Sequence, residues 1–143
     1  MFYANTAMII PHNIKMNNNE KYDPTYKIIG AIYEVSNNLG KGLLESAYHR
    51  ALIHELKSMG FKVESEVPIE VNYKGESLGV CFRADIIVDD TVILELKAVE
   101  KMEKVYFKQL LTYLRLTGKK VGLLINFGEL DIKNGIHRIV NNF

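Results

Sequence analysis

The sequence predicts an α/β domain in which helices pack on a mixed β-sheet, and three observations carry this prediction. Two stretches, over about 23–39 and 43–59, carry apolar residues at helical spacing. A run of strand-like segments follows over about 61–98, with turns short enough for antiparallel pairing. A third helical stretch then joins two apolar segments, which is typical of a βαβ unit with parallel strands and a right-handed crossover.

The first two predicted helices have clear ends. Asp23 and Pro24 form a favourable start, because Asp is a preferred N-cap and Pro suits the first helical position. Gly40 ends the first helix, and Gly60 follows the second at the C-terminal position that glycine favours. Apolar residues recur every three or four positions, so each helix has one face to bury.

The later segments complete the predicted sheet. Strand candidates cover 61–67, 69–73, 78–88 and 92–98. The third helix covers about 103–117 and stops at Gly118. The segment 121–127 is nearly all apolar, which predicts an interior strand covered on both faces, and 136–140 is a candidate edge strand. A chain of 143 residues suits one domain with a real core, which we place at 21–143.

Composition excludes membrane and disulfide-rich classes. No apolar run approaches the roughly 20 residues that span a bilayer. The segment 1–16 lacks the features of a signal peptide, and we expect residues 1–20 to form a flexible leader, with Met16 as an alternative start. Cys81 is the only cysteine and forms no internal disulfide, which suits a cytoplasmic protein. Its apolar neighbours predict a small packed thiol.

The net charge of +1, from 18 basic and 17 acidic residues, is lower than that of most proteins that bind nucleic acid mainly through electrostatics. The basic residues are unevenly placed, and seven lie in one stretch: Lys97, Lys101, Lys104, Lys108, Arg115, Lys119 and Lys120. This stretch is a candidate phosphate-binding surface. The alternative is a solvated helix face, which composition alone favours.

The strongest chemical signal is a pair of apolar strands with charged residues where a core would hold none. Asp85 lies in one strand, and Glu95 and Lys97 lie two residues apart on one face of the next. Burying such groups without partners costs on the order of several kcal/mol. Carboxylate oxygens suit Mg²⁺ or Mn²⁺, which lower the pKa of a bound water, and Lys97 would orient that water or stabilise the transition state. The alternative, equally compatible with strand patterning, is charge on an exposed strand face.

The turn between these two strands decides whether the acids meet. A two-residue loop sends Asp85 and Glu95 to opposite faces of the sheet. A three-residue loop over 89–91 places them directly across from each other. Strand alternation does not choose between these registers, so a metal site requires an odd loop or a bulge.

Two helical residues are further candidates. Glu45 lies one turn before Tyr48 on a face expected to pack toward the sheet, so it can reach a metal; the alternative is an acid that complements the helix dipole. Gln109 lies one turn before Tyr113 and can hold a water or phosphate; the alternative is a glutamine satisfied by the backbone. The four histidines, His49 among them, show no metal-ligand spacing and receive no role.

Several short motifs, in their order and spacing, make the chain resemble a known family. The segment Gly42-Leu43-Leu44-Glu45-Ser46-Ala47-Tyr48 is similar to the signature of the GxxExxY protein family, which is placed in the PD-(D/E)xK nuclease superfamily. The resemblance runs from about 28 to 140. It also includes Arg83-Ala84-Asp85, Glu95-Leu96-Lys97-Ala98, the segment from Gln109 to Leu114 and the strand from Gly122 to Gly128.

The resemblance implies a three-layer, restriction-endonuclease-like α/β core and Mg²⁺-dependent hydrolysis of a phosphodiester. By this resemblance Asp85 matches the first superfamily acid, and Glu95 with Lys97 matches the (D/E)xK element. Glu45 matches a helical acid of many members, and Gln109 matches a residue on the following helix. The implied catalytic set is these five residues, with Asp85, Glu95 and Glu45 as ligands of Mg²⁺ or Mn²⁺.

Two positions depart from the family pattern. Ala84 replaces the proline of the motif, which leaves the acid in place, and Ser36 stands where relatives often have histidine. We expect a metal-dependent nuclease that acts on DNA, with RNA also open as a substrate and a homodimer as a way to double the basic surface. The alternative, which the near-neutral charge favours, is a catalytically silent module that binds nucleic acid or protein on a nuclease scaffold.

Overall fold

The computed structural model describes residues 23–142, so the leader expected over residues 1–20 lies outside the described residues. The elements follow in the order α1 (Thr25–Leu39), α2 (Glu45–Ser58), β1 (Val63–Tyr73), β2 (Glu76–Val88), β3 (Val92–Lys97), α3 (Lys104–Thr117), β4 (Val121–Asn126), the 3₁₀ helix η1 (Ile132–Gly135) and β5 (Ile136–Val140). Within this described part of the chain, no helix has the length and apolar character needed to cross a membrane.

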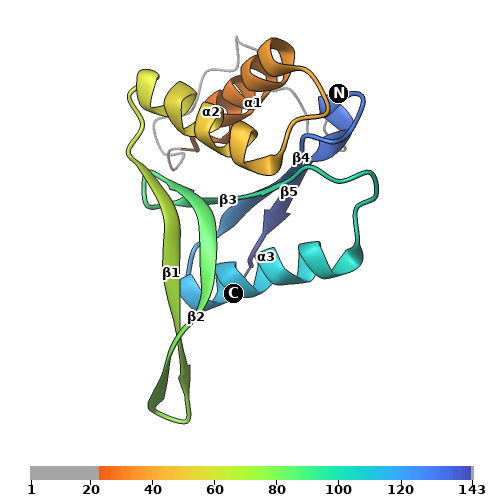
Figure 1. Cartoon of the computed structure of the whole chain (residues 1–143). Coiled ribbons are helices and arrows are strands. Elements are labelled where there is room, and N and C mark those ends of the chain that lie inside the picture. The colour runs from red at the N-terminus through yellow and green to blue at the C-terminus, as the bar shows by residue number, and fades with distance from the viewer. Residues whose placement is uncertain (1–22, 143) are drawn as a thin grey trace.

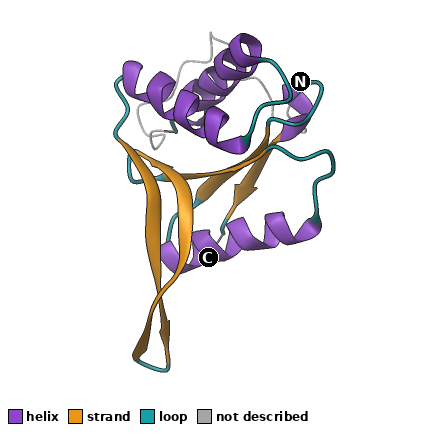
Figure 2. Ribbon diagram, viewed as in Figure 1, coloured by secondary structure: helices purple, strands orange, loops and turns teal. Residues whose placement is uncertain are grey.

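The five strands form one mixed sheet in the order β1-β2-β3-β4-β5. β3 and β4 run parallel, as the βαβ pattern predicted, and the other neighbouring strands are antiparallel. α1 and α2 cover one face of the sheet and α3 covers the other (Figure 1). Figure 2 shows the same three layers by element type. The predicted α/β fold with a mixed sheet is confirmed.

The sheet separates two apolar cores. Leu94 and Leu123 belong to the core under α1 and α2, whereas Ile93 and Leu124 belong to the core under α3. This alternation follows from the pleat of the strands, which sends successive side chains to opposite faces. β4 is buried along nearly its whole length, as its apolar run predicted.

Residues 61–73 contain one strand rather than the two that the sequence suggested. β1 continues through Pro68, which lies opposite Arg83 of β2. Proline is tolerated at this position because β1 is an edge strand with β2 as its one neighbour. The predicted break at Pro68 was therefore wrong.

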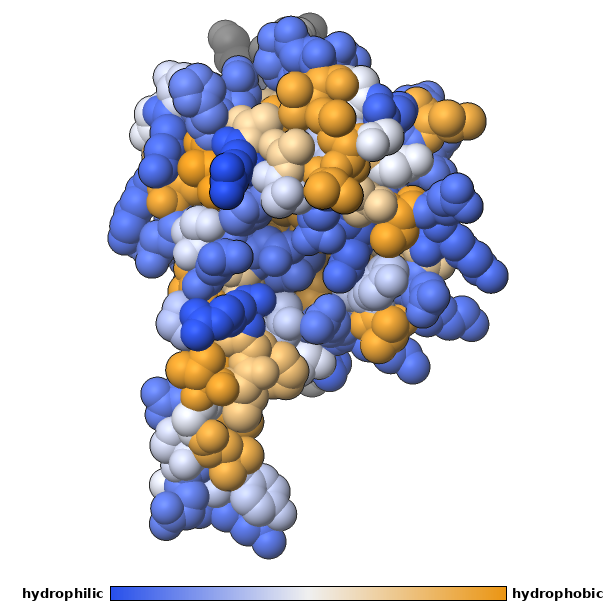
Figure 3. Space-filling model, viewed as in Figure 1, coloured by the Kyte–Doolittle hydropathy of each residue, from blue (hydrophilic) through white to orange (hydrophobic). Residues whose placement is uncertain are grey.

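β1 and β2 continue past the body of the protein as a two-stranded arm, defined here as residues 70–81 (Figure 1). β3 pairs only with residues 86–88 of β2, so no third strand supports the arm. Tyr73, Leu78 and Val80 are exposed there, and Figure 3 shows hydrophobic surface on the arm. Cys81 is also exposed, so the predicted packed thiol was wrong; Val80 beside it is exposed as well, and only Phe82 packs against a core.

The carboxyl ends of β3 and β4 are tied together. Phe127 donates its N–H to the carbonyl of Lys97 at 2.8 Å, and the Asn126 side chain bonds both the N–H and the C=O of Val99. Gly128 packs closely on the same loop, since a Cβ there would lie 2.3 Å from the Val99 carbonyl oxygen. These contacts fix the segment that follows β3.

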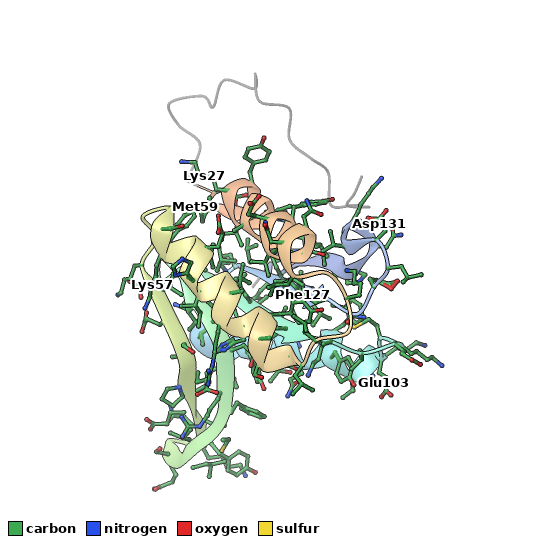
Figure 4. All side chains as sticks on the ribbon, turned by 45° about the horizontal axis from the view of Figure 1, so that its top comes forward. Lys27, Lys57, Met59, Glu103, Phe127 and Asp131 are labelled. Atoms are coloured by element: carbon green, nitrogen blue, oxygen red, sulfur yellow. The ribbon has the colours of Figure 1, made fainter. Side chains whose placement is uncertain are left out.

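Tyr48 fixes the loop that precedes α2. Its ring stacks on Phe127 with centroids 4.6 Å apart, and Figure 4 shows Phe127 beneath the two N-terminal helices. Its hydroxyl donates to the Gly40 carbonyl at 2.7 Å and accepts from the Leu43 N–H at 3.3 Å. Glu45, the first residue of α2, is therefore held at the sheet edge where β3 and β4 end.

Candidate active site

β2 and β3 separate at the point where the two strand acids stand. The ladder between them ends at Ile86 opposite Leu94, and the turn spans three residues, 89–91. The same register, continued by one step, places Asp85 opposite Glu95. This is the register that the metal hypothesis required.

Side chains replace the missing ladder bonds around Asp85. Its N–H donates to Glu95 Oε1 at 3.0 Å, and the N–H of Leu96 donates to Asp85 Oδ2 at 2.8 Å. The Asp85 carbonyl oxygen lies 3.1 Å from Nε2 of His49 on α2. The two carboxyl groups also lie within hydrogen-bonding reach of each other. The acids therefore converge.

Glu95 is buried, with only 5% of its surface exposed. Burial first, and then the neighbouring Asp85 carboxylate, raise the pKa of Glu95 to about 8, although the Asp85 N–H and the Lys97 ammonium act in the opposite direction. The alternative of an exposed strand face is therefore wrong for Glu95. A buried carboxyl group beside a second carboxylate favours a proton or a cation between them.

Lys97 lies on the same face of β3 as Glu95, as the two-residue spacing predicted. Its ammonium lies 4.4 Å from the centroid of the Tyr106 ring on α3, which is a cation–π contact. Its positive charge acts to lower the pKa of both Glu95 and Glu45. The lysine is therefore held by an aromatic ring while its charge acts on the acids.

Glu45 joins these groups from the start of α2. Its pKa is raised, first by burial and then by the Asp85 carboxylate, while Lys97 and His49 act in the opposite direction. The residue as a whole is exposed. Glu45 thus lies at the rim of the site, within electrostatic reach of the strand acids.

α3 contributes Tyr113 and Gln109. Tyr113 is buried, and its pKa is raised by burial and then by Glu95 and Asp85. A side-chain hydrogen bond from Gln109 to Tyr113 opposes this shift. Gln109 is therefore linked to the acids through Tyr113, whose pKa both acids raise.

Comparison with known proteins decides the family. Residues 22–139 match the sequence profile of the PD-(D/E)XK nuclease superfamily. The chain belongs to this superfamily. Among solved structures, one titled "Crystal structure of SSO0001" aligns with a TM-score of 0.45 and 19% identity over 85% of this chain and 68% of that chain. A search of the curated proteins gave no match.

Membership in the PD-(D/E)XK superfamily agrees with the architecture. A mixed five-stranded sheet flanked by helices is the restriction-endonuclease-like fold that the sequence predicted. Asp85 of β2 meets the segment Glu95-Leu96-Lys97 of β3 at the point where the ladder between these strands ends. The residues that the resemblance matched to the superfamily motif therefore lie where the β2–β3 ladder ends.

Two neighbours of the site were not predicted. His49 contacts Asp85, but spacing among the histidines themselves gave it no role. His49 lies four residues after Glu45 on the same helix face, and this spacing could have placed it near the site. Tyr106 lies against Lys97, and its position in the α3 stripe with Gln109 is the corresponding signal.

The basic stretch does not form one surface. Lys101, Lys104 and Lys108 are exposed on the loop before α3 and along its first half. Lys119 lies at the opposite end of β3, where its ammonium donates to the Asp90 carbonyl at 2.7 Å. A pocket of about 420 Å³ lies at that opposite end and contains none of the site acids. Within the stretch, the exposed lysines that follow the Lys97 end of β3 are therefore Lys101, Lys104 and Lys108.

The donor set fits a hard divalent cation. Over residues 23–142, no three His, Cys, Asp or Glu side chains already stand in a metal-holding arrangement. Two carboxyl groups nevertheless converge, with Glu45 nearby, and carboxylate oxygens are the ligands that Mg²⁺ and Mn²⁺ prefer. A cation would relieve the repulsion that raises the pKa of Glu95.

Proposed function

We propose that this protein is a metal-dependent nuclease that hydrolyses DNA phosphodiester bonds. One observation carries the proposal: Glu95 is buried against Asp85, and both burial and the Asp85 carboxylate disfavour ionisation of Glu95. Such perturbed pairs cluster at functional sites. Nucleases of this superfamily generally use divalent metals, which accounts for the pair.

Asp85 and Glu95 are the residues that would hold the cation, and Glu45 would complete the site from α2, directly or through a water. When bound, the cation supplies a water of lowered pKa and neutralises charge on the phosphate. The backbone N–H groups of Asp85 and Leu96 orient the two carboxylates. The acids therefore need little rearrangement to present their oxygens.

Lys97 would position the attacking water or stabilise the negative charge that develops on the phosphate. A fixed ammonium suits this role, because a preorganised charge costs little reorganisation during the reaction. Tyr106 limits its movement from one side. Gln109 supports the same region through Tyr113.

The substrate is proposed to be DNA that lies along the start of α3. Lys101, Lys104 and Lys108 are exposed there and follow Lys97 along the chain. Cations in such a row attract successive phosphates. These three lysines form a short row on a chain whose net charge is only +1, and a second copy of the chain would double the row.

We also infer that the chain is a member of the GxxExxY family. Each residue in the name of that motif has a physical task here. Gly42 has a φ of 89°, Glu45 lies at the site, and the Tyr48 hydroxyl holds the intervening loop. The motif thus describes how α2 brings an acid to the strand acids.

The test is cleavage of single-stranded, duplex and branched DNA, and of RNA of the same sequences, with Mg²⁺ or Mn²⁺. We expect at least one DNA form to be cut and EDTA to stop the reaction. Glu95→Gln and Lys97→Ala should each lower the rate by about 10² to 10³-fold, the scale of removing one preorganised electrostatic group.

Matched controls are Glu76→Gln on the arm and Lys57→Ala at the end of α2, both exposed and outside the site. Their rates should equal that of the parent. Failure to cut any substrate, or equal rates for the site variants and the parent, rejects the proposal. DNA binding without cleavage would support the silent-module alternative.

A further inference from the structure

Asp85 stands at a break in both of its strand ladders. On one side, β1 and β2 pair as Ser65 with Ile86 and then as Val67 with Ala84, so the step between is skipped. On the other side, the β2–β3 ladder ends one step before Asp85. Its backbone N–H and C=O therefore need partners from elsewhere, because unpaired backbone groups are costly to bury.

The N–H of Asp85 donates to the Glu95 carboxylate, and the carbonyl oxygen of Asp85 contacts the imidazole of His49. Nε2 of His49 lies 3.1 Å from the Asp85 carbonyl oxygen and 3.4 Å from the Ser65 hydroxyl. A carbonyl oxygen can only accept a hydrogen bond, so Nε2 must carry the hydrogen. The contact fixes both the ring orientation and the tautomer of His49.

His49 and Glu45 project from the same face of α2, one turn apart. The helix thus contacts the site at two points, with a carboxylate toward the acids and an imidazole on the backbone of Asp85. Any displacement of β2 at the break would have to stretch the imidazole contact. α2 therefore contributes, beside the N–H of Leu96, to where the Asp85 carboxylate lies relative to Glu95.

We propose that His49 is a positioning residue that holds the backbone of Asp85 at the strand break, so that its carboxylate and Glu95 face one cation. The role rests on the proposed nuclease function for its chemical purpose. The contact itself is a property of the metal-free protein. Loss of a residue that orients a metal ligand typically lowers metal affinity or activity by about 10 to 100-fold.

The first experiment uses the unaltered protein and needs no activity. Two-bond ¹H–¹⁵N correlation spectra of the metal-free chain report the tautomer of each histidine. We expect His49 in the Nε2–H form, with an amide of Asp85 that exchanges slowly. An Nδ1–H tautomer for His49 overturns the proposal.

The second experiment is calorimetric titration with Mn²⁺ of the parent, His49→Ala, His49→Gln and His49→Asn. The amide nitrogen of Gln reaches about as far as Nε2, whereas that of Asn is shorter. We expect the affinity for Mn²⁺ to fall about tenfold or more in the Ala and Asn variants and to be largely restored in the Gln variant. His54→Ala, an exposed histidine on the same helix, is the control and should match the parent.

Equal affinity in the parent and His49→Ala, or no difference between the Gln and Asn variants, overturns the role. In cleavage assays the loss should appear in kcat, with KM for DNA little changed, because His49 touches the backbone of Asp85 and not the basic row. A parent that binds no Mn²⁺ would reject the proposed nuclease function. The tautomer measurement would then still decide whether His49 holds Asp85.

Discussion

The two ends of the β2–β3 pair differ in chemistry although they are neighbours in sequence. Beside the turn, Val88, Val92 and Leu94 are buried and belong to a regular ladder. One step further, Asp85 and Glu95 leave the ladder and exchange bonds between side chains and backbone. The regular end contributes buried apolar surface, and the irregular end presents charge. The comparison shows how a rigid strand pair can hold two acids together.

The regular end should dominate stability. Leu94 has no exposed surface, so Leu94→Ala should lower the free energy of unfolding by about 2 to 5 kcal/mol, as other buried leucines do. Urea denaturation followed by circular dichroism measures this. Val105→Ala, at a position 56% exposed on α3, is the control and should change stability by less than about 0.5 kcal/mol. A loss below about 1 kcal/mol for Leu94→Ala would contradict the packing described at this end.

Local pattern predicted this regular part well. Helical spacing gave all three helices within a few residues, and the apolar run of β4 predicted its place inside the sheet. Patterns failed where a contact is not local. Cys81 was expected in a core from its apolar neighbours, but Cys81 itself is exposed at the end of the arm, although Phe82 beside it packs against the core under α3. Two strand candidates, 61–67 and 69–73, were expected where β1 runs continuously through Pro68, because an edge strand tolerates proline.

The candidate site residues were chosen from residue type, spacing and the family resemblance, and residue patterns left open whether the two strand acids meet. The sequence allowed two registers, and the turn chose one. Asp89 and Asp90 both adopt a left-handed backbone, with φ of 49° and 57°, which aspartate tolerates better than most residues. His49 was missed because its partner is a backbone carbonyl 36 residues away, and the identity of a side chain says nothing about such a partner.

The irregular end should make stability depend on pH in the metal-free protein. The pKa of Glu95 is 4.5 in a solvated reference and about 8 in the fold. Between these values the unfolded chain loses the proton first, so stability falls as pH rises from 4.5 to about 8, by on the order of a few kcal/mol. Below 4.5 both states are protonated, and above about 8 both are ionised, so the slope from this group vanishes.

Denaturation of the parent and Glu95→Gln in EDTA, at several pH values across this window, isolates the effect. Titrating groups that do not interact with Glu95 are common to both proteins and cancel in the difference. The advantage of the Gln variant should grow with pH and level off near 8. A difference that stays constant across the window would mean that Glu95 is not held near Asp85 in a buried environment.

Divalent cations should offset the loss of stability that ionisation of Glu95 causes as the pH rises. Ligand binding to the folded state alone stabilises it by about 2.7 kcal/mol at one hundred times the dissociation constant. Mn²⁺ should therefore raise the melting temperature of the parent, and more at pH 8 than at pH 6, because the carboxyl groups must lose their protons to bind. Thermal denaturation with and without Mn²⁺ measures this. Glu95→Gln should show a much smaller shift, whereas Glu76→Gln should behave as the parent; equal shifts in all three proteins would place the cation elsewhere.

The smallest effect on stability is expected at the start of β2, far from the site acids. Leu78 lies on the arm and is 56% exposed, so Leu78→Ser should change the free energy of unfolding by no more than about 0.5 kcal/mol and leave cleavage unchanged. This sharpens the contrast, because one strand, β2, would then contain a segment that stabilises the fold, a segment that holds the acids and a segment that does neither. Denaturation at two protein concentrations measures it. A loss above about 1 kcal/mol that grows with protein concentration would show that Leu78 is covered by a second copy of the chain, since only an assembled state makes stability depend on concentration.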